Sequence, residues 1–307
     1  MQNSGLVCAI DLGTNSALGL VARRTTSGQL EEVDGFVEMP RLGEGLARTG
    51  VIGPEGIERA VTVLSGFRAR CAELGVERLR IVGTAVFRRA SNGADVARLL
   101  GERIDCPFDV LSEDDEADLG YRAVVADGAS GDTIVVDVGG GSTEVAARGG
   151  AFRRSIPVGG VVLTERFLEA NEGAGFDALC QYAREQLSEL PDDLAPKDSE
   201  VQPDVVALGG TGSNVACLEL GLDRFDHRRA EGVTIEPARC LDAAKKMAAM
   251  SIEARRELPI EPERAPILPA GMACLGLVLQ RIGVAGARVS NRGLRFEIAR
   301  RMLADVD

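Results

Sequence analysis

The sequence predicts an α/β protein made of two related domains, and three observations support this expectation. Strand-like and helix-like apolar patterns alternate along the 307 residues, which is typical of α/β folds. An apolar run that ends in Asp and continues into a Gly-rich turn occurs twice, at 9–16 and 136–143. Hydrophobic residues make up 45% of the chain, enough for one or two packed cores. We expect domains at 1–126 and 127–307 that face each other across a cleft.

The first half of the chain shows a strand meander followed by alternating helices and strands. The helical spacing that begins at Pro54 stops at Gly75, a residue type that commonly ends helices. Acidic residues open the last helix of this half, where they suit the helix dipole. We expect strands at about 6–11, 18–24, 31–39, 78–83 and 108–111, and helices at about 54–74, 94–103 and 113–126.

The second half repeats the pattern of a strand that runs into glycines. A third Gly-rich stretch, 209–213, follows an apolar strand and is interpreted as another loop. The closing helix, about 293–307, is expected to pack on the first domain. We expect strands at about 133–138, 205–208 and 288–290, and a long apolar helix at about 267–282.

Composition excludes several classes of partner. The net charge is −12 with only three lysines and no basic tract, so nucleic acid is not an expected ligand. No apolar run reaches the length of a membrane helix, and no signal peptide precedes the first apolar segment. We therefore expect a cytoplasmic protein without a membrane partner. The seven cysteines form no CxxC pair and are expected to be buried, reduced thiols.

The Gly-rich stretches point to phosphate chemistry. Glycines let backbone N–H groups approach an anion, and an Asp at a strand end can hold Mg²⁺. A single stretch of this kind is equally typical of an ordinary tight turn, but three of them favour a phosphate site. The candidate phosphate-binding residues are Gly13, Thr14, Asn15, Ser16, Gly139, Gly140, Gly141, Ser142, Thr143, Gly210 and Thr211, and the strand-end aspartates are Asp11 and Asp137.

Other phosphate machinery is absent from the sequence, so carboxylates must carry out the acid–base chemistry. No GxxxxGK[ST] motif and no cysteine followed six residues later by arginine occur. His227 is the only histidine, which argues against a His-rich metal site. Glu144, after the second Gly-rich turn, and Glu116, in the acidic cluster 113–116, are the candidates. Taken alone, such a cluster is more typical of a solvated helix start.

Eight motifs, which together span nearly the whole chain, occur in the order found in one known family. They are DLGTNS (11–16), RLGEG (41–45), GTAVFR (83–88) with Asn92, SEDDEA (112–117), DVGGGSTE (137–144), SIPVG (155–159), GGT (209–211) and VSNRGLR (289–295). The chain thereby resembles the exopolyphosphatase/guanosine pentaphosphate phosphatase family in a short, two-domain form. The resemblance implies two ribonuclease-H-like lobes of the actin, Hsp70 and sugar-kinase superfamily.

The resemblance also implies roles for individual residues. Glu116 corresponds to the family's catalytic glutamate, and Arg88 to its phosphate-contacting arginine. Glu144 and Asp137 correspond to its loop carboxylates. Together with Asp11 they are the expected ligands of Mg²⁺, with Mn²⁺ as an alternative. The sequence departs from the family's pattern at Leu18, Glu113, Pro266 and Phe296, which puts substrate length and affinity in doubt more than activity.

The resulting functional hypothesis is an exopolyphosphatase that releases terminal orthophosphate from inorganic polyphosphate, with a preference for short chains. A guanosine pentaphosphate 5′-phosphatase is the main alternative. An ATP-dependent sugar or acetate kinase of the same superfamily, or a non-catalytic phosphate- or nucleotide-sensing module, would also fit the fold. The expected partner is therefore polyphosphate or guanosine pentaphosphate, and a homodimer is an open option.

Overall fold

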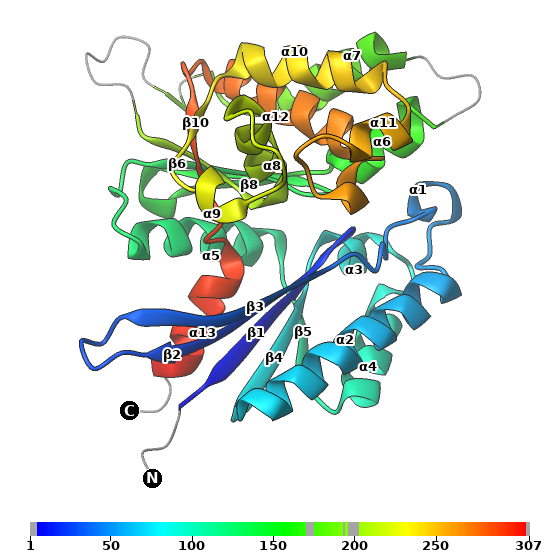
Figure 1. Ribbon diagram of the computed structural model, residues 1–307. Coiled ribbons are helices and arrows are strands. Elements are labelled where there is room, and N and C mark those ends of the chain that lie inside the picture. Colours follow the sequence, from blue (N-terminus) through cyan, green and yellow to red (C-terminus); the bar gives the residue numbers. More distant parts are fainter. Residues whose placement is uncertain (1–4, 170–174, 193, 196–202, 305–307) are drawn as a thin grey trace. The chain divides into compact units, whose positions relative to one another are not determined.

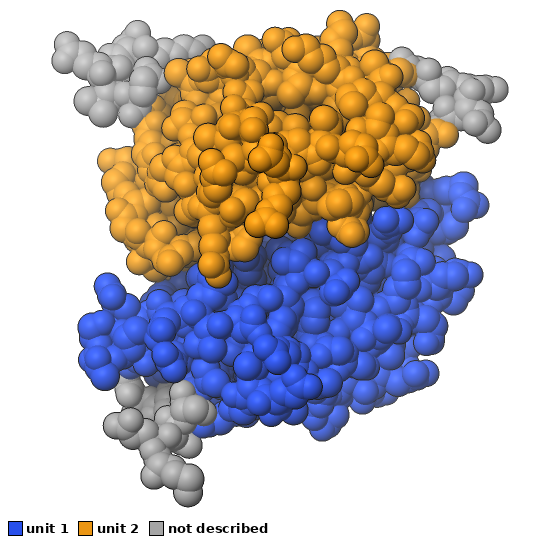
Figure 2. Space-filling model, viewed as in Figure 1, with its two compact units in different colours: residues 1–119, 294–307 blue, residues 120–293 orange. Residues whose placement is uncertain are grey.

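The structure is a computed structural model, and it describes residues 5–169, 175–192, 194–195 and 203–304. The chain divides into two compact units, residues 1–119 with 294–307 and residues 120–293, which Figure 2 colours separately. The division falls within helix α5 (Glu113–Ala126), and the expected boundary at residue 126 is the last residue of the same helix. Each unit is a separate α/β structure (Figure 1).

Unit 1 is built on a five-stranded sheet with the order β3-β2-β1-β4-β5. Strands β1, β2 and β3 form an antiparallel meander, whereas β4 and β5 run parallel to β1. The strands are β1 (Val7–Leu12), β2 (Ala17–Arg24), β3 (Leu30–Glu38), β4 (Arg78–Gly83) and β5 (Phe108–Val110). The helices are α1 (Leu46–Thr49), α2 (Pro54–Leu74), α3 (Ala85–Arg89), α4 (Gly93–Ile104), the first part of α5, and α13 (Leu294–Ala304).

The alternation of side chains along β1 explains how helices cover both faces of this sheet. Cys8, Ile10 and Leu12 share one core with apolar residues of α2 and α4. The alternate residues Val7 and Ala9 are also buried, and α13 packs on β1 and β2. Because successive strand residues point to opposite faces, the two sets of helices lie on opposite sides of the sheet (Figure 1). Residues 305–307 of the expected closing helix lie outside the described residues.

Unit 2 is built on a six-stranded sheet with the order β10-β11-β9-β6-β7-β8. Its core is crossed by the apolar helix α12 (Leu268–Ile282), which packs against α6, α7, α8 and α10. The strands are β6 (Ile134–Val138), β7 (Thr143–Ala147), β8 (Phe152–Ile156), β9 (Val205–Leu208), β10 (Thr234–Ile235) and β11 (Ala287–Ser290). The other helices are α6 (Gly160–Phe167), α7 (Gly175–Leu187), α8 (Gly209–Glu219), α9 (His227–Ala230), α10 (Pro237–Ala248) and α11 (Ile252–Arg256), with 3₁₀ turns η1 (Arg148–Gly150) and η2 (Pro262–Arg264).

The two units have the same strand order apart from the additional edge strand β10. The meander β6-β7-β8 corresponds to β1-β2-β3, β9 to β4, and β11 to β5. The two Gly-rich hairpins even close with the same hydrogen bond. The Gly13 N–H donates to the Ser16 carbonyl at 2.8 Å, and the Gly139 N–H to the Ser142 carbonyl at 2.9 Å. This duplicated ribonuclease-H-like arrangement confirms the predicted fold class.

One local expectation is wrong. Residues 209–213 do not form a loop, because α8 begins at Gly209 directly after β9. Gly209 has a φ of 82°, a conformation that glycine adopts at little cost. This single residue turns the chain from the strand into the helix. The third Gly-rich stretch is therefore a helix N-terminus rather than a hairpin loop.

The remaining expectations about the chain as a whole concern cysteines and membranes. All seven cysteines are free and buried, as predicted. Burial raises the pKa of Cys240 to about 12 and that of Cys274 to about 11, so these thiols stay protonated near neutral pH. Within the described part of the chain, no helix combines the length and the apolar character needed to cross a membrane.

Candidate active site

The carboxyl ends of three parallel strands meet at one edge of the unit 1 sheet. Gly13 follows β1, Thr84 follows β4, and Leu111 follows β5. Backbone hydrogen bonds join these ends, from the Thr84 N–H to the Leu12 carbonyl at 3.3 Å and from the Leu111 N–H to the Gly83 carbonyl at 2.9 Å. In open α/β sheets, ligands bind at this edge. A ligand of unit 1 is therefore expected to bind at this edge.

The Gly-rich hairpin at this edge presents its amides in one direction. The Thr14 carbonyl accepts a hydrogen bond from the Gly43 N–H at 2.8 Å, and the Asn15 carbonyl accepts one from the Arg41 N–H at 3.0 Å. The C=O and N–H groups of a trans peptide point in opposite directions. The N–H groups of Asn15 and Ser16 therefore point away from the segment that holds the carbonyls. Such an arrangement suits an anion.

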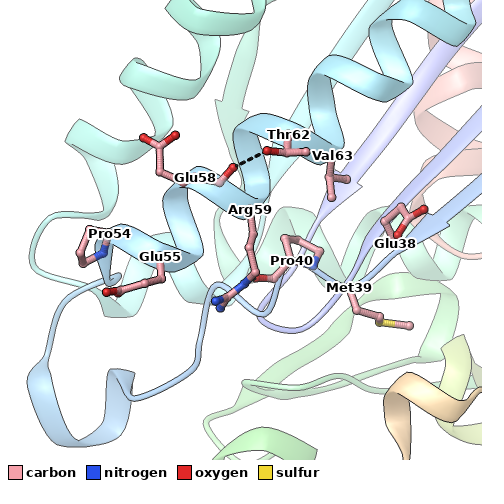
Figure 3. A pocket seen from close by; sticks show the side chains of 9 residues that line it. All are labelled: Glu38, Met39, Pro40, Pro54, Glu55, Glu58, Arg59, Thr62 and Val63. Carbon is pink, nitrogen blue, oxygen red and sulfur yellow. Dashed lines mark hydrogen bonds between the residues drawn. The ribbon is translucent and has the colours of Figure 1, made fainter.

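Arg59 of α2 holds the supporting segment in place. Its Nε donates to the Pro40 carbonyl at 2.8 Å, and its Nη2 to the Arg41 carbonyl at 3.3 Å and to Glu44 at 2.7 Å. Arg41 has a φ of 52°, which is uncommon for a residue with a side chain and requires such support. Figure 3 shows Arg59 beside Pro40 in a cavity of about 610 Å³. None of the residues that line this cavity belongs to the predicted site.

The predicted base and the predicted phosphate-binding arginine form an ion pair within unit 1. Arg88 Nη1 donates to Glu116 Oε2 at 2.7 Å and to the Leu111 carbonyl at 2.9 Å. The two side chains are only 18% and 11% exposed. Arg88 Nε is buried and has no hydrogen-bond partner among the described residues. Arg88 therefore has an unused donor beside the carboxylate that it pairs with.

Glu116 differs from the acidic residues before it in its burial and in its contacts. Glu113, Asp114 and Asp115 are exposed, whereas Glu116 is partly buried. The Ser112 hydroxyl accepts a hydrogen bond from the Asp115 N–H at 3.1 Å and donates to its carboxylate at 2.6 Å, so these two residues cap the start of α5. The position at the start of a helix thus accounts for the three acidic residues that precede Glu116. Glu116 is the residue of this cluster that pairs with Arg88.

A row of polar side chains crosses three strands in unit 2. Asp137 on β6 lies directly opposite Glu144 on β7, and Glu144 lies directly opposite Ser155 on β8. Opposed residues of antiparallel strands project from the same face. Glu144 is only 7% exposed, and its Oε1 accepts a hydrogen bond from the Ser155 hydroxyl at 2.7 Å. The row therefore places two carboxylates and a hydroxyl side by side.

The glycines of the second hairpin allow a close approach to α6. The Gly139 and Gly140 carbonyls accept hydrogen bonds from the Gly160 and Val161 N–H groups, both at 2.9 Å. The N–H groups of Gly140 and Gly141 consequently point away from α6, as in the first hairpin. A Cβ on Gly159 would lie 2.6 Å from the Gly139 oxygen, so this position requires glycine. Ser142 and Thr143 are buried, and the Thr143 hydroxyl donates to the Val158 carbonyl at 2.6 Å.

The N-terminus of α8 adjoins Asp137. A Cβ on Gly209 would lie 2.8 Å from Asp137 Oδ1, and a Cβ on Gly210 would clash with the guanidinium of Arg264. Arg264 is itself buried and donates to Glu261. The Thr211 hydroxyl, a predicted phosphate ligand, donates to the Val138 carbonyl at 3.0 Å. In this arrangement the N–H groups of the first helical turn, rather than that hydroxyl, are the groups suited to an anion.

Of the three predicted metal ligands, Asp137 and Glu144 lie side by side in unit 2. Asp137 and Glu144 provide adjacent oxygens of the kind that Mg²⁺ prefers, and Mg²⁺ commonly uses one or two carboxylates together with water and phosphate oxygens. In unit 1 the residue directly opposite Asp11 is Leu18, so this strand pairing places no second carboxylate at the corresponding position. Across the described ranges, no three His, Cys, Asp or Glu side chains gather into a metal-binding group. An Asp137–Glu144 pair is thus the fitting candidate.

The predicted residues therefore fall into two groups, one in each unit. Unit 1 contains Asp11, Gly13, Thr14, Asn15, Ser16, Arg88 and Glu116, and unit 2 contains Asp137, Gly139 to Glu144, Gly210 and Thr211. Ser155 and Arg264 were missed as site residues. Ser155 belongs to the SIPVG motif, but its contact with Glu144 depends on strand register. Arg264 follows Glu261 and Glu263 in a short Pro-rich segment, and no local pattern marks it as a neighbour of the α8 start.

The fold and the site together define a class of protein with two ribonuclease-H-like units, each with an Asp-and-glycine hairpin at the end of its first strand. The chain belongs to the Ppx/GppA phosphatase family, whose model matches residues 21–305. Membership supports a phosphate-releasing hydrolase as the general activity.

Several solved structures are similar over nearly the whole chain. An exopolyphosphatase-like protein is 25% identical with a TM-score of 0.85, and the match covers 98% of this chain and 100% of that one. An Aquifex aeolicus member of the Ppx/GppA family is 24% identical with a TM-score of 0.76, covering 98% of both chains. An exopolyphosphatase from Cytophaga hutchinsonii is 20% identical with a TM-score of 0.84, covering 98% and 99%. The last two likenesses concern the fold.

Proposed function

We propose that the protein is an exopolyphosphatase that releases terminal orthophosphate from inorganic polyphosphate, with short chains as preferred substrates. Membership of the Ppx/GppA phosphatase family and the 25% identity to an exopolyphosphatase-like protein support this proposal. The observation that carries it is the partly buried ion pair of Arg88 and Glu116. It lies at the carboxyl edge of the unit 1 sheet and combines a candidate base with a candidate phosphate ligand.

The proposed chemistry divides into positioning, charge neutralisation and proton removal. Phosphoryl transfer depends mainly on an in-line nucleophile and on stabilising the charge of the phosphate oxygens. The N–H groups of both hairpins and the guanidinium of Arg88 would bind those oxygens. Glu116 would orient the attacking water and accept its proton. Mg²⁺, or alternatively Mn²⁺, bound by Asp137 and Glu144 would neutralise phosphate charge and help to order the water.

The ion pair suggests how base and substrate binding are linked. Arg88 uses Nη1 for Glu116 while its Nε has no partner among the described residues. A guanidinium binds two phosphate oxygens through adjacent N–H groups. A terminal phosphate would therefore bind along the Nε edge of Arg88 while Nη1 keeps its hydrogen bond to Glu116. The carboxylate would then lie next to the bound phosphate, where it can orient the water that attacks the phosphorus.

The aromatic residues favour polyphosphate over guanosine pentaphosphate. The chain has no Trp and two Tyr. Tyr121 is buried, and its hydroxyl donates to the Gly131 carbonyl at 2.5 Å. Tyr182 stacks beneath the guanidinium of Arg166, at 4.2 Å from the ring centroid. Both tyrosines thus have contacts within the protein, and a chain of phosphates needs no aromatic platform.

The proposal is tested by measuring phosphate release from polyphosphates of several lengths, from guanosine pentaphosphate and from ATP, each with and without Mg²⁺. We expect release from short polyphosphate that depends on the cation and fails in a Glu116→Gln variant. Faster release from guanosine pentaphosphate than from any polyphosphate would favour the alternative activity. Binding without release from any of these substrates would contradict a hydrolase and favour a sensing role.

A further inference from the structure

We propose that Arg59 is a positioning residue that orients and polarises the Ser16 N–H for phosphate through two peptide groups. The inference deepens the proposed function and rests on it, because it assigns a phosphate to the first Gly-rich hairpin. Arg59 lies on α2, outside the eight motifs noted above. Its Nε donates to the Pro40 carbonyl at 2.8 Å, and its side chain lies beside Pro40 in Figure 3.

Two consecutive hydrogen bonds connect the guanidinium with an amide of the hairpin. The Pro40 carbonyl that accepts from Arg59 belongs to the same peptide group as the Arg41 N–H. The Arg41 N–H donates to the Asn15 carbonyl at 3.0 Å, and the peptide group of that carbonyl carries the Ser16 N–H. Because the C=O and N–H of a trans peptide point in opposite directions, the two peptide groups lie head to tail between Arg59 and the Ser16 N–H.

This series of hydrogen bonds affects the Ser16 N–H in two ways. It fixes the direction of both peptide groups, because each carbonyl is held by a donor. It also begins with a positive charge, and hydrogen bonds in a chain polarise one another. Glu44 pairs with Nη2 of Arg59 rather than with Nε, and its carboxylate is exposed, so solvent screens much of its opposing charge. Both effects make the Ser16 N–H a better donor to an anion.

The duplicated fold explains why unit 1 needs a side chain for this purpose. In unit 2, carbonyls of the second hairpin accept hydrogen bonds from N–H groups of the regular helix α6. In unit 1 the supporting residues 39–45 lie between β3 and α1 and belong to neither. Arg41 within them has a φ of 52°, a conformation that costs free energy for a residue with a side chain. Arg59 therefore supplies the rigidity that a helix supplies in unit 2.

The test is a titration with inorganic phosphate, followed by NMR at the Ser16 amide in protein labelled with ¹⁵N-serine. The Ser16 resonance should shift as phosphate is added to the wild-type protein. In Arg59→Gln, which removes the charge, the Kd for phosphate should rise about 3- to 10-fold, the size expected for the loss of one hydrogen bond. If that variant does not fold, Arg59→Lys, which loses the planar geometry, should still raise the Kd about two- to fivefold.

Arg68 provides a matched control on the same helix. Its Nη1 donates to the Asp105 carbonyl at 2.6 Å and its Nη2 to the Asp105 carboxylate at 2.9 Å. Asp105 has a φ of 49°, similar to that of Arg41, and the side chains of Arg59 and Arg68 are 40% and 44% exposed. Arg68→Gln should therefore cost similar stability but leave the Kd for phosphate unchanged. Equal losses of phosphate affinity in Arg59→Gln and Arg68→Gln would overturn the proposal.

Phosphate release from short polyphosphate is measured separately on the same proteins. Arg59→Gln should lower kcat/KM about 3- to 10-fold, and Arg68→Gln should not. If no substrate releases phosphate, the proposed function fails, yet the NMR titration still decides whether Arg59 acts on the Ser16 amide. Conversely, the inference fails and the proposed function stands if the active enzyme shows no response of Ser16 to phosphate. The same holds if the folded Arg59 variants bind phosphate as tightly as the wild-type protein.

Discussion

Replacing Arg88 by lysine tests the proposed link between substrate binding and the base. The substitution keeps the positive charge but removes the planar guanidinium. In the structure, one nitrogen, Nη1, serves both Glu116 and the Leu111 carbonyl, and Nε remains for a further acceptor. The single nitrogen of lysine cannot contact the backbone carbonyl and two phosphate oxygens in the same fixed geometry.

The size of the effect follows from the contacts that are lost. A hydrogen bond to a charged group contributes about 1.5–3 kcal/mol, and about 1.4 kcal/mol corresponds to a factor of about ten in rate or affinity. Loss of one such contact from Arg88 should therefore lower kcat/KM by about 10- to 100-fold. Folding should change little, because the positive charge beside Glu116 is retained.

The assay is phosphate release at substrate concentrations below and above KM, with Arg89→Lys as the control. Arg89 follows Arg88 on the same short helix, but its side chain is exposed, so its substitution should have little effect. Equal losses in the two variants would refute the reasoning, since they would show that the partly buried arginine is not the one that faces the phosphate.

Two further predictions concern the α8 start and the mode of digestion. Gly209→Ala should lower activity at least about tenfold and cost about 1–3 kcal/mol of stability, because the new Cβ would meet Asp137. Gly232→Ala, at a φ of 77° with open space around it, should cost similar stability with full activity. Equal activities of the Gly209→Ala and Gly232→Ala variants would contradict the prediction that the α8 start matters for activity. The net charge of −12 repels the part of a polyphosphate tail that comes within about one Debye length of the protein surface. We therefore expect distributive digestion of long polyphosphate, visible as a ladder of intermediates on gels. Full-length chains beside free phosphate would show processive action instead.

The elements that the sequence predicted well are those with clear local signals. Pro54 and Gly75 mark the ends of α2 as expected, with Gly75 at a φ of 74°. The start of α8 was misjudged because glycines disfavour helices. At Gly209 the chain turns from β9 into the helix, beside Asp137 of the neighbouring strand β6. No local sequence pattern shows this proximity of two strands. A turn can be predicted from single residues, whereas a contact between strands can be identified only from the three-dimensional fold.

The candidate site shows the same limit. The motifs contained Glu144, Glu116, Arg88 and Ser155, but they did not show which of these residues are in contact. The contact of Glu144 with Ser155 depends on the register of β7 and β8, and a one-residue slip would turn Ser155 to the other face. The pairing of Glu116 with Arg88 joins residues far apart in the sequence. Resemblance supplied the candidates, and only the structure supplied the hydrogen bonds that distinguish Glu116 from its acidic neighbours.

The most direct measurement of the central claim is the turnover number of Glu116→Gln beside that of Asp115→Asn, on short polyphosphate at saturating concentration. Glutamine keeps an oxygen that can accept from Arg88, so the protein should fold normally, yet it cannot take a proton from water. We predict a fall in kcat of about 10²–10⁴-fold for Glu116→Gln and a small change for Asp115→Asn, whose carboxylate belongs to the cap of α5. Near wild-type turnover for Glu116→Gln would contradict the account.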